Sequence, residues 1–191
     1  MRDIELQPTA AAHWHALVCE AEQKARRELG EDVQSYLVFL LQRFLSKPEI
    51  ASRILALDYL TGLLSTGHQQ HDKLRDVGDI CLLFAGLYPQ RARHRRVSAN
   101  YYVDLGIGAY QQLQNAAGHS LGRLYAQLSE HFVPAMDVLQ TMRDLGADEP
   151  ALDPLTAFEL WENTDSRRAR ETLTEISSGT LVRSNDDQRR H

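Results

Sequence analysis

The chain has 191 residues, of which 43 % are hydrophobic and 25 % are charged, and its formal net charge at pH 7 is −5. This composition excludes wholesale disorder and a collagen-like chain, and the length predicts one domain with its own hydrophobic core. The acidic balance argues against a polycation that coats nucleic acid, so nucleic acid is not the expected partner.

The N-terminus and the cysteines bear on location. Residues 1–12 are polar and carry no apolar run behind a basic start, which is not the pattern of a signal peptide. The longest nearly apolar stretch, 81–88, is far shorter than the ~20 residues that a membrane helix needs. Cys19 and Cys81 each lie in an apolar helical pattern, so we expect both to be buried, reduced thiols. The sequence therefore predicts a cytoplasmic protein that does not cross a membrane.

Helical spacing dominates the first third of the chain. A first helix is expected at about residues 9–29, ending at Gly30, which favours helix termination. The second shows the wide apolar stripe of a core-facing helix, formed by Val33, Tyr36, Leu37, Leu40, Leu41, Phe44 and Leu45. A third, about 47–65, begins with a capping box at Ser46 and Glu49, and its nearly continuous apolar surface predicts a central position.

These two helices are predicted to join in the core. The side chains expected to be almost fully buried are Leu37, Leu40, Leu41, Phe44, Ile54 and Leu57.

The rest of the chain continues in the same period. A fourth helix is expected at about 66–88 and a fifth from Ser98, where Gly106 and Gly108 weaken the helix unless they permit close packing. A sixth begins near 119, is broken or kinked at Pro134, and resumes as far as 146.

A last helix, about 155–176, is expected to bury Leu155, Phe158 and Trp161. We therefore predict an all-α, single-domain bundle of six or seven helices over residues 1–176, with no β-sheet. Residues 177–191 are predicted to form a polar, mobile tail.

Eight histidines make a metal site worth testing, but the spacings that metal sites use are absent. No Asp or Glu is followed by His three residues later, which excludes the di-iron pattern, and zinc spacings are missing. His68 and His71 could face one cation, with Asp72 beside them, but we interpret them as the polar first turn of the fourth helix. His68, His71 and His131 are therefore expected to hold no metal ion. We expect no metal and no cofactor.

Two weak resemblances define the alternative, a metal- or haem-dependent helical enzyme. The pair His71-Asp72 resembles that of the HD-domain phosphohydrolases, although here a polar segment precedes it. Residues 118–122, with an N-terminal His13 or His15, resemble the distal helix and haem ligand of the haem oxygenase-like fold, although Arg123 stands where that motif continues with glycine. These resemblances imply a metal and a haem, respectively.

Several carboxylates sit in helical patterns and need partners. Asp58 interrupts the apolar third helix, so we expect either a catalytic carboxylate with a raised pKa or one paired with an arginine or a tyrosine hydroxyl. Asp72, Asp76 and Asp79 share part of one helix face, where like charges repel, so they are predicted to form half of a salt-bridge network.

One basic segment stands out in this acidic chain. Four arginines and a histidine fall within six residues, with two tyrosines shortly after: Arg91, Arg93, His94, Arg95, Arg96, Tyr101 and Tyr102. The segment is either a solvated loop beside a helix end or a surface that binds an anion bidentately.

We interpret the protein as a non-catalytic helical binding module that acts through residues 91–96. The expected partner is another protein chain, its own copy included, or a small anionic ligand.

Overall fold

The computed structural model describes residues 9–46, 54–90, 92, 96–146 and 152–177, and it is all-helical in these ranges, as predicted. The described residues form nine helices and no strand, so the expected six or seven helices were too few. Within the same ranges, no helix is both long and apolar enough to cross a membrane. Of the predicted tail, only Ser177 is described, and it ends the last helix.

The N-terminal pair is α1 (Ala10–Ala25) and α2 (Glu31–Ser46). Thr9 caps α1 by accepting a hydrogen bond from the Ala12 amide. The helix ends at Arg26, in the left-handed region with φ 51°, and therefore earlier than the predicted end at Gly30. A hydrogen bond within the connection accompanies the early end, since the buried carboxylate of Glu22 accepts from the Leu29 amide at 2.6 Å.

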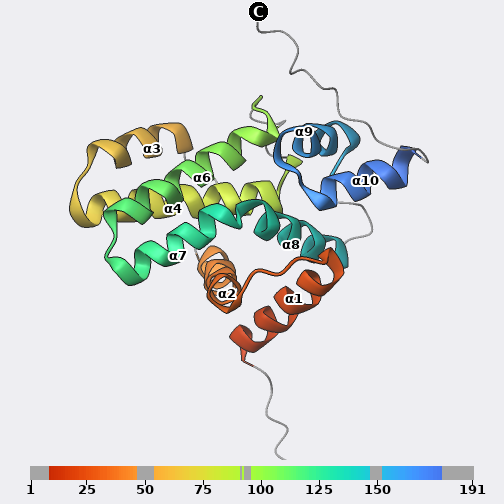
Figure 1. The fold of residues 1–191 in the computed structure, drawn as a ribbon, viewed down its shortest axis with the longest axis horizontal. Helices are drawn as coiled ribbons and strands as arrows, with labels where there is room; N and C mark the ends of the chain where they lie inside the picture. The colour runs from red at the N-terminus through yellow and green to blue at the C-terminus, as the bar shows by residue number, and fades with distance from the viewer. Residues whose placement is uncertain (1–8, 47–53, 91, 93–95, 147–151, 178–191) are drawn as a thin grey trace, which may run out of the picture.

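The centre of the molecule is α4 (Gly67–Gly86), which packs against α3 (Leu55–Leu64), α6 (Ala99–Ala116) and α8 (Phe132–Leu145). Residues 77–86 of α4 are all buried. Figure 1 shows α4 and α6 lying side by side across the molecule. A Cβ built on Gly106 would lie 2.5 Å from the Phe132 ring. This glycine therefore permits close packing of α6 against α8, the role that the sequence allowed for it.

The central position predicted for the third helix is wrong. Only Leu55 and Gly62 of α3 are buried, and Figure 1 shows α3 at the outer edge beside α4 and α6. Ile54 is 66 % exposed and Leu57 is 59 % exposed, although both were expected in the core. The physical reason is that, among the described helices, α3 packs mainly against α4 and α6, so its other apolar side chains face away from them.

The other predicted core residues fare better. Leu37, Leu40 and Leu41 are buried, as expected, in one cluster with the inner faces of the remaining helices. Phe44 is only partly buried and packs against that cluster, with its ring centroid 5.8 Å from that of Tyr88.

The expected break near Pro134 is confirmed, because α7 (His119–Glu130) and α8 meet at His131. The single helix predicted at 155–176 is instead two helices, α9 (Pro154–Thr164) and α10 (Arg167–Ser177), which pack against each other. Leu155 and Phe158 of α9 are exposed rather than buried, whereas Trp161 is buried as expected.

A buried carboxylate explains the division between α9 and α10. Asp137 of α8 accepts hydrogen bonds from the Ser166 hydroxyl at 2.6 Å and from the Arg167 amide at 2.9 Å. It also forms an ion pair with Arg27 at 2.5 Å. These bonds hold the chain where Asp165 turns into the left-handed region, with φ 57°. The turn between α9 and α10 therefore depends on a contact with α8, and the sequence around residue 165 gives no sign of that contact.

Candidate functional site

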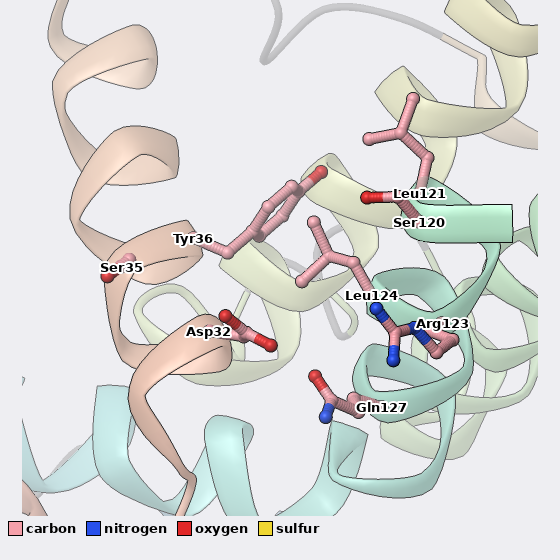
Figure 2. A pocket seen from close by; sticks show the side chains of 8 residues that line it. All are labelled: Asp32, Ser35, Tyr36, Ser120, Leu121, Arg123, Leu124 and Gln127. Atoms are coloured by element: carbon pink, nitrogen blue, oxygen red, sulfur yellow. The ribbon is translucent and has the colours of Figure 1, made fainter. Parts of the chain in front are cut away.

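A groove of about 530 Å³ runs between α2 and α7, and we call it the α2–α7 groove. Its volume lies in the range of small-molecule sites, roughly 300–1,000 Å³. Figure 2 shows the side chains that line it: Asp32, Ser35 and Tyr36 from α2, and Ser120, Leu121, Arg123, Leu124 and Gln127 from α7.

The lining of the α2–α7 groove is divided along its length. In Figure 2, Tyr36 and Leu124 face each other in the middle, and Asp32, Arg123 and Gln127 gather at one end. The amide oxygen of Gln127 is buried and has no hydrogen-bond partner. Buried polar atoms normally have a hydrogen-bond partner, so an unpaired one is an unusual feature of this wall of the groove.

Beneath the groove lies a buried carboxylate, Asp79 of α4. The Tyr36 hydroxyl donates to its Oδ1 at 2.6 Å and the Tyr110 hydroxyl does so at 3.0 Å. The Arg43 guanidinium donates to its Oδ2 at 2.7 Å. Burial raises the pKa of Asp79 to about 6, because desolvation outweighs the lowering by the Tyr36 hydrogen bond and the Arg43 charge. We call Tyr36, Arg43, Asp79 and Tyr110 the Asp79 network.

Further charges join the Asp79 network on its outer side. Arg43 also binds Asp76, and the Arg75 guanidinium lies 3.2 Å from Asp72. The prediction that Asp72, Asp76 and Asp79 belong to a salt-bridge network is therefore confirmed, with Arg43 and Arg75 as the basic partners. Both oxygens of Asp79 are engaged, so the network links α2 to α4 and α6 and leaves no buried carboxylate oxygen open to a substrate.

A second exposed feature is the outward side of α3. Five large aliphatic side chains face away from the molecule, and we call them the α3 apolar face: Ile54, Leu57, Leu60, Leu63 and Leu64. A cavity of about 180 Å³ adjoins its first residue and reaches Val97 and Tyr101.

Most of the predicted arginine surface lies outside the described residues, namely Arg91, Arg93, His94 and Arg95. Arg96 is exposed and adopts a left-handed backbone with φ 57°. Tyr101 is half-buried beside the cavity at the start of α3. Tyr102 is 1 % exposed, so its ring belongs to the core, against Phe84. The anion-binding role of the arginine run stays a prediction.

The histidines of the enzyme alternative are separated. His13 and His15 are exposed on α1, which packs against α2 and α8, whereas residues 118–122 begin α7. The Nε2 atom of His71 lies 3.1 Å from the Tyr125 hydroxyl, and Asp72 points outward. Within the described part of the chain, no group of three or more His, Cys, Asp or Glu side chains could hold a metal ion.

The remaining candidate residues are placed as follows. Asp58 is half-buried in the first turn of α3. Cys81 is buried, as expected, and burial raises the pKa of its thiol. Cys19 is only partly buried, contrary to expectation, and its sulfur lies 3.7 Å from Nδ1 of His15.

Sequence reasoning missed the polar residues of the groove and, in the Asp79 network, Arg43 and Tyr110. Arg43 carried a signal, because it is a charge next to the apolar stripe of its helix. Asp32 and Arg123 carried none, since they are ordinary surface charges until the fold brings α2 and α7 together. The α2–α7 groove and the α3 apolar face are thus the two surface features on which a function can be argued. Comparison of the chain with protein-family models, with curated proteins and with solved structures finds no match.

Proposed function

We propose that the protein is a non-catalytic binding module that associates with a second copy of itself through the α3 apolar face. One observation carries the proposal: five large aliphatic side chains, four on α3 and one at its N-cap, stand exposed, from Leu63 at 37 % to Leu64 at 88 %. Contiguous exposed apolar patches on soluble domains usually mark interaction sites.

The exposed apolar surface is large enough for a dimer. The exposed fractions of the five side chains add up to about three fully exposed aliphatic residues. Burying each such residue contributes about 1.5–3 kcal/mol, hence roughly 5–9 kcal/mol per copy. An interface with twofold symmetry uses the same patch twice, which gives roughly 9–18 kcal/mol against an association cost of about 4–15 kcal/mol. Subtracting the cost leaves a surplus that runs from below zero to about 14 kcal/mol. A micromolar dimer needs about 8 kcal/mol, which lies inside that range.

The low charge of α3 makes a second copy possible as the partner. Two molecules that each carry a net charge of −5 repel each other, so they can associate only through a surface with few charges. The ten residues of α3 include a single charged side chain, Asp58. A twofold arrangement can place the α3 helices of the two copies against each other with leucine facing leucine.

The test is the molar mass of the full chain by sedimentation or light scattering, from about 1 to 100 μM. We expect a concentration-dependent dimer, lost in the double variant Leu57→Glu/Leu64→Glu. The matched control is Leu155→Glu, because Leu155 is also 59 % exposed but lies on α9. A wild-type monomer at the highest concentration overturns the proposal, and so does a dimer that survives the double variant.

A further inference from the structure

The polar end of the α2–α7 groove presents charges of both signs. Asp32 and Arg123 are exposed side chains on its opposite walls, and neither forms an ion pair with any residue that the structure describes. Figure 2 shows Asp32 and Arg123 on the two sides of the groove, at its polar end. A ligand that satisfies both charges must bring an acceptor for the guanidinium and a donor for the carboxylate.

The middle of the groove is apolar and rigid on one side. The Tyr36 ring forms the α2 wall, and its hydroxyl is held by the buried Asp79 at 2.6 Å. Leu121 and Leu124 form the α7 wall, and Leu121 is 49 % exposed. The Tyr36 side chain is already held in place before a ligand binds. A ligand side chain that packs on it therefore costs little conformational entropy of the protein.

We propose that the α2–α7 groove binds a free α-amino acid with an apolar side chain. The ammonium group of the ligand binds the carboxylate of Asp32. Its carboxylate binds the guanidinium of Arg123, and its side chain lies between Tyr36 and Leu124.

This ligand class follows from the arrangement of charges. A simple carboxylate can pair with Arg123 but gains nothing from Asp32, and a simple amine can pair with Asp32 but gains nothing from Arg123, whereas a zwitterion gains from both. The groove, about 530 Å³ in volume, also has room for an aromatic amino acid. The site is separate from the α3 apolar face, so it does not depend on self-association.

The experiment is calorimetric titration of the full chain with L-phenylalanine and L-leucine. Two probes each lack one charge: N-acetyl-L-phenylalanine has no ammonium group, and phenethylamine has no carboxylate. We expect saturable binding of at least one of the two amino acids by the wild type. Binding of either single-charge probe should be at least about tenfold weaker.

Variants assign each charge to its residue. Arg123→Gln should weaken amino-acid binding about tenfold or more and abolish the preference over phenethylamine. Asp32→Asn should weaken amino-acid binding to a similar extent and abolish the preference for the amino acid over N-acetyl-L-phenylalanine. The control is Glu31→Gln, since this acidic neighbour on the first turn of α2 does not line the groove.

Three results would overturn the proposal. They are no saturable binding of either amino acid up to about 10 mM, equal binding of a single-charge probe, and unchanged preferences in both groove variants. Circular dichroism of each variant ensures that a loss of binding reflects the groove and not the fold.

Discussion

Protonation of Asp79 should stabilise the fold as the pH falls. The pKa of this carboxyl is about 6 in the folded protein and 3.8 as its ordinary value, because burial penalises the charged form. A raised pKa in the folded state means that the native protein binds a proton more tightly than the unfolded chain does. The stabilisation is therefore complete only below the ordinary pKa of 3.8, and it is lost as the pH rises through 6.

The magnitude follows from the difference of about two pKa units. At about 1.4 kcal/mol per unit, the full effect is about 3 kcal/mol, of which about 1 kcal/mol appears between pH 7.5 and 5 and about 2 kcal/mol by pH 4. Burial also raises the pKa of Asp137, which acts in the same direction. The contribution of Asp79 must therefore be measured against a variant.

The assay is urea unfolding of the wild type and of Asp79→Asn across this pH range. The amide oxygen can still accept from Tyr36 and Tyr110, but the amide NH2 takes the place of the oxygen that accepts from Arg43. The variant therefore loses the Arg43 contact at every pH, and only the pH dependence of the difference reports the titration. The free energy of unfolding of the wild type minus that of the variant should rise on acidification. Asp72→Asn is the control, because Asp72 is exposed on the same helix. A difference that falls on acidification would show that Arg43 and the tyrosines outweigh desolvation and would refute the reasoning.

Two further predictions concern packing. Leu41→Ala should lower the free energy of unfolding by about 2–5 kcal/mol, whereas Leu57→Ala in the monomer should change it by less than about 0.5 kcal/mol, because Leu41 is 2 % exposed and Leu57 is 59 % exposed. Equal losses in chemical denaturation would contradict the edge position of α3. Gly78→Ala should cost about 1–3 kcal/mol in the same assay, since the new Cβ would lie 2.5 Å from the Tyr110 ring. An unchanged free energy of unfolding would mean that α4 and α6 can move apart to make room for the Cβ without loss of stability.

The sequence predicted which segments form helices better than it predicted where each helix packs in the fold. The apolar stripe of α2 identified Leu37, Leu40 and Leu41 as core residues, because one face of an amphipathic helix must be buried against something. The same reasoning failed for α3, whose apolar residues surround the helix and do not say which side meets α4. The candidate site was less predictable still. The arginine run stood out in the sequence, whereas Asp32 and Arg123 became neighbours only through the packing of α2 and α7.

The local sequence was enough to predict the all-α class of the described residues, the cap at Ser98 and the break before Pro134. Capping and proline geometry act within a turn or two of the chain, so their effects can be read from neighbouring residues. The pairing of the carboxylates on α4 also followed from their spacing. The tertiary structure alone decided that α4 is the central helix, that Asp137 divides α9 from α10, and that the α3 apolar face stays uncovered. The physical reason is that each of these outcomes depends on which surfaces meet across long sequence separations, and a period of 3.6 residues carries no information about the partner of an apolar face.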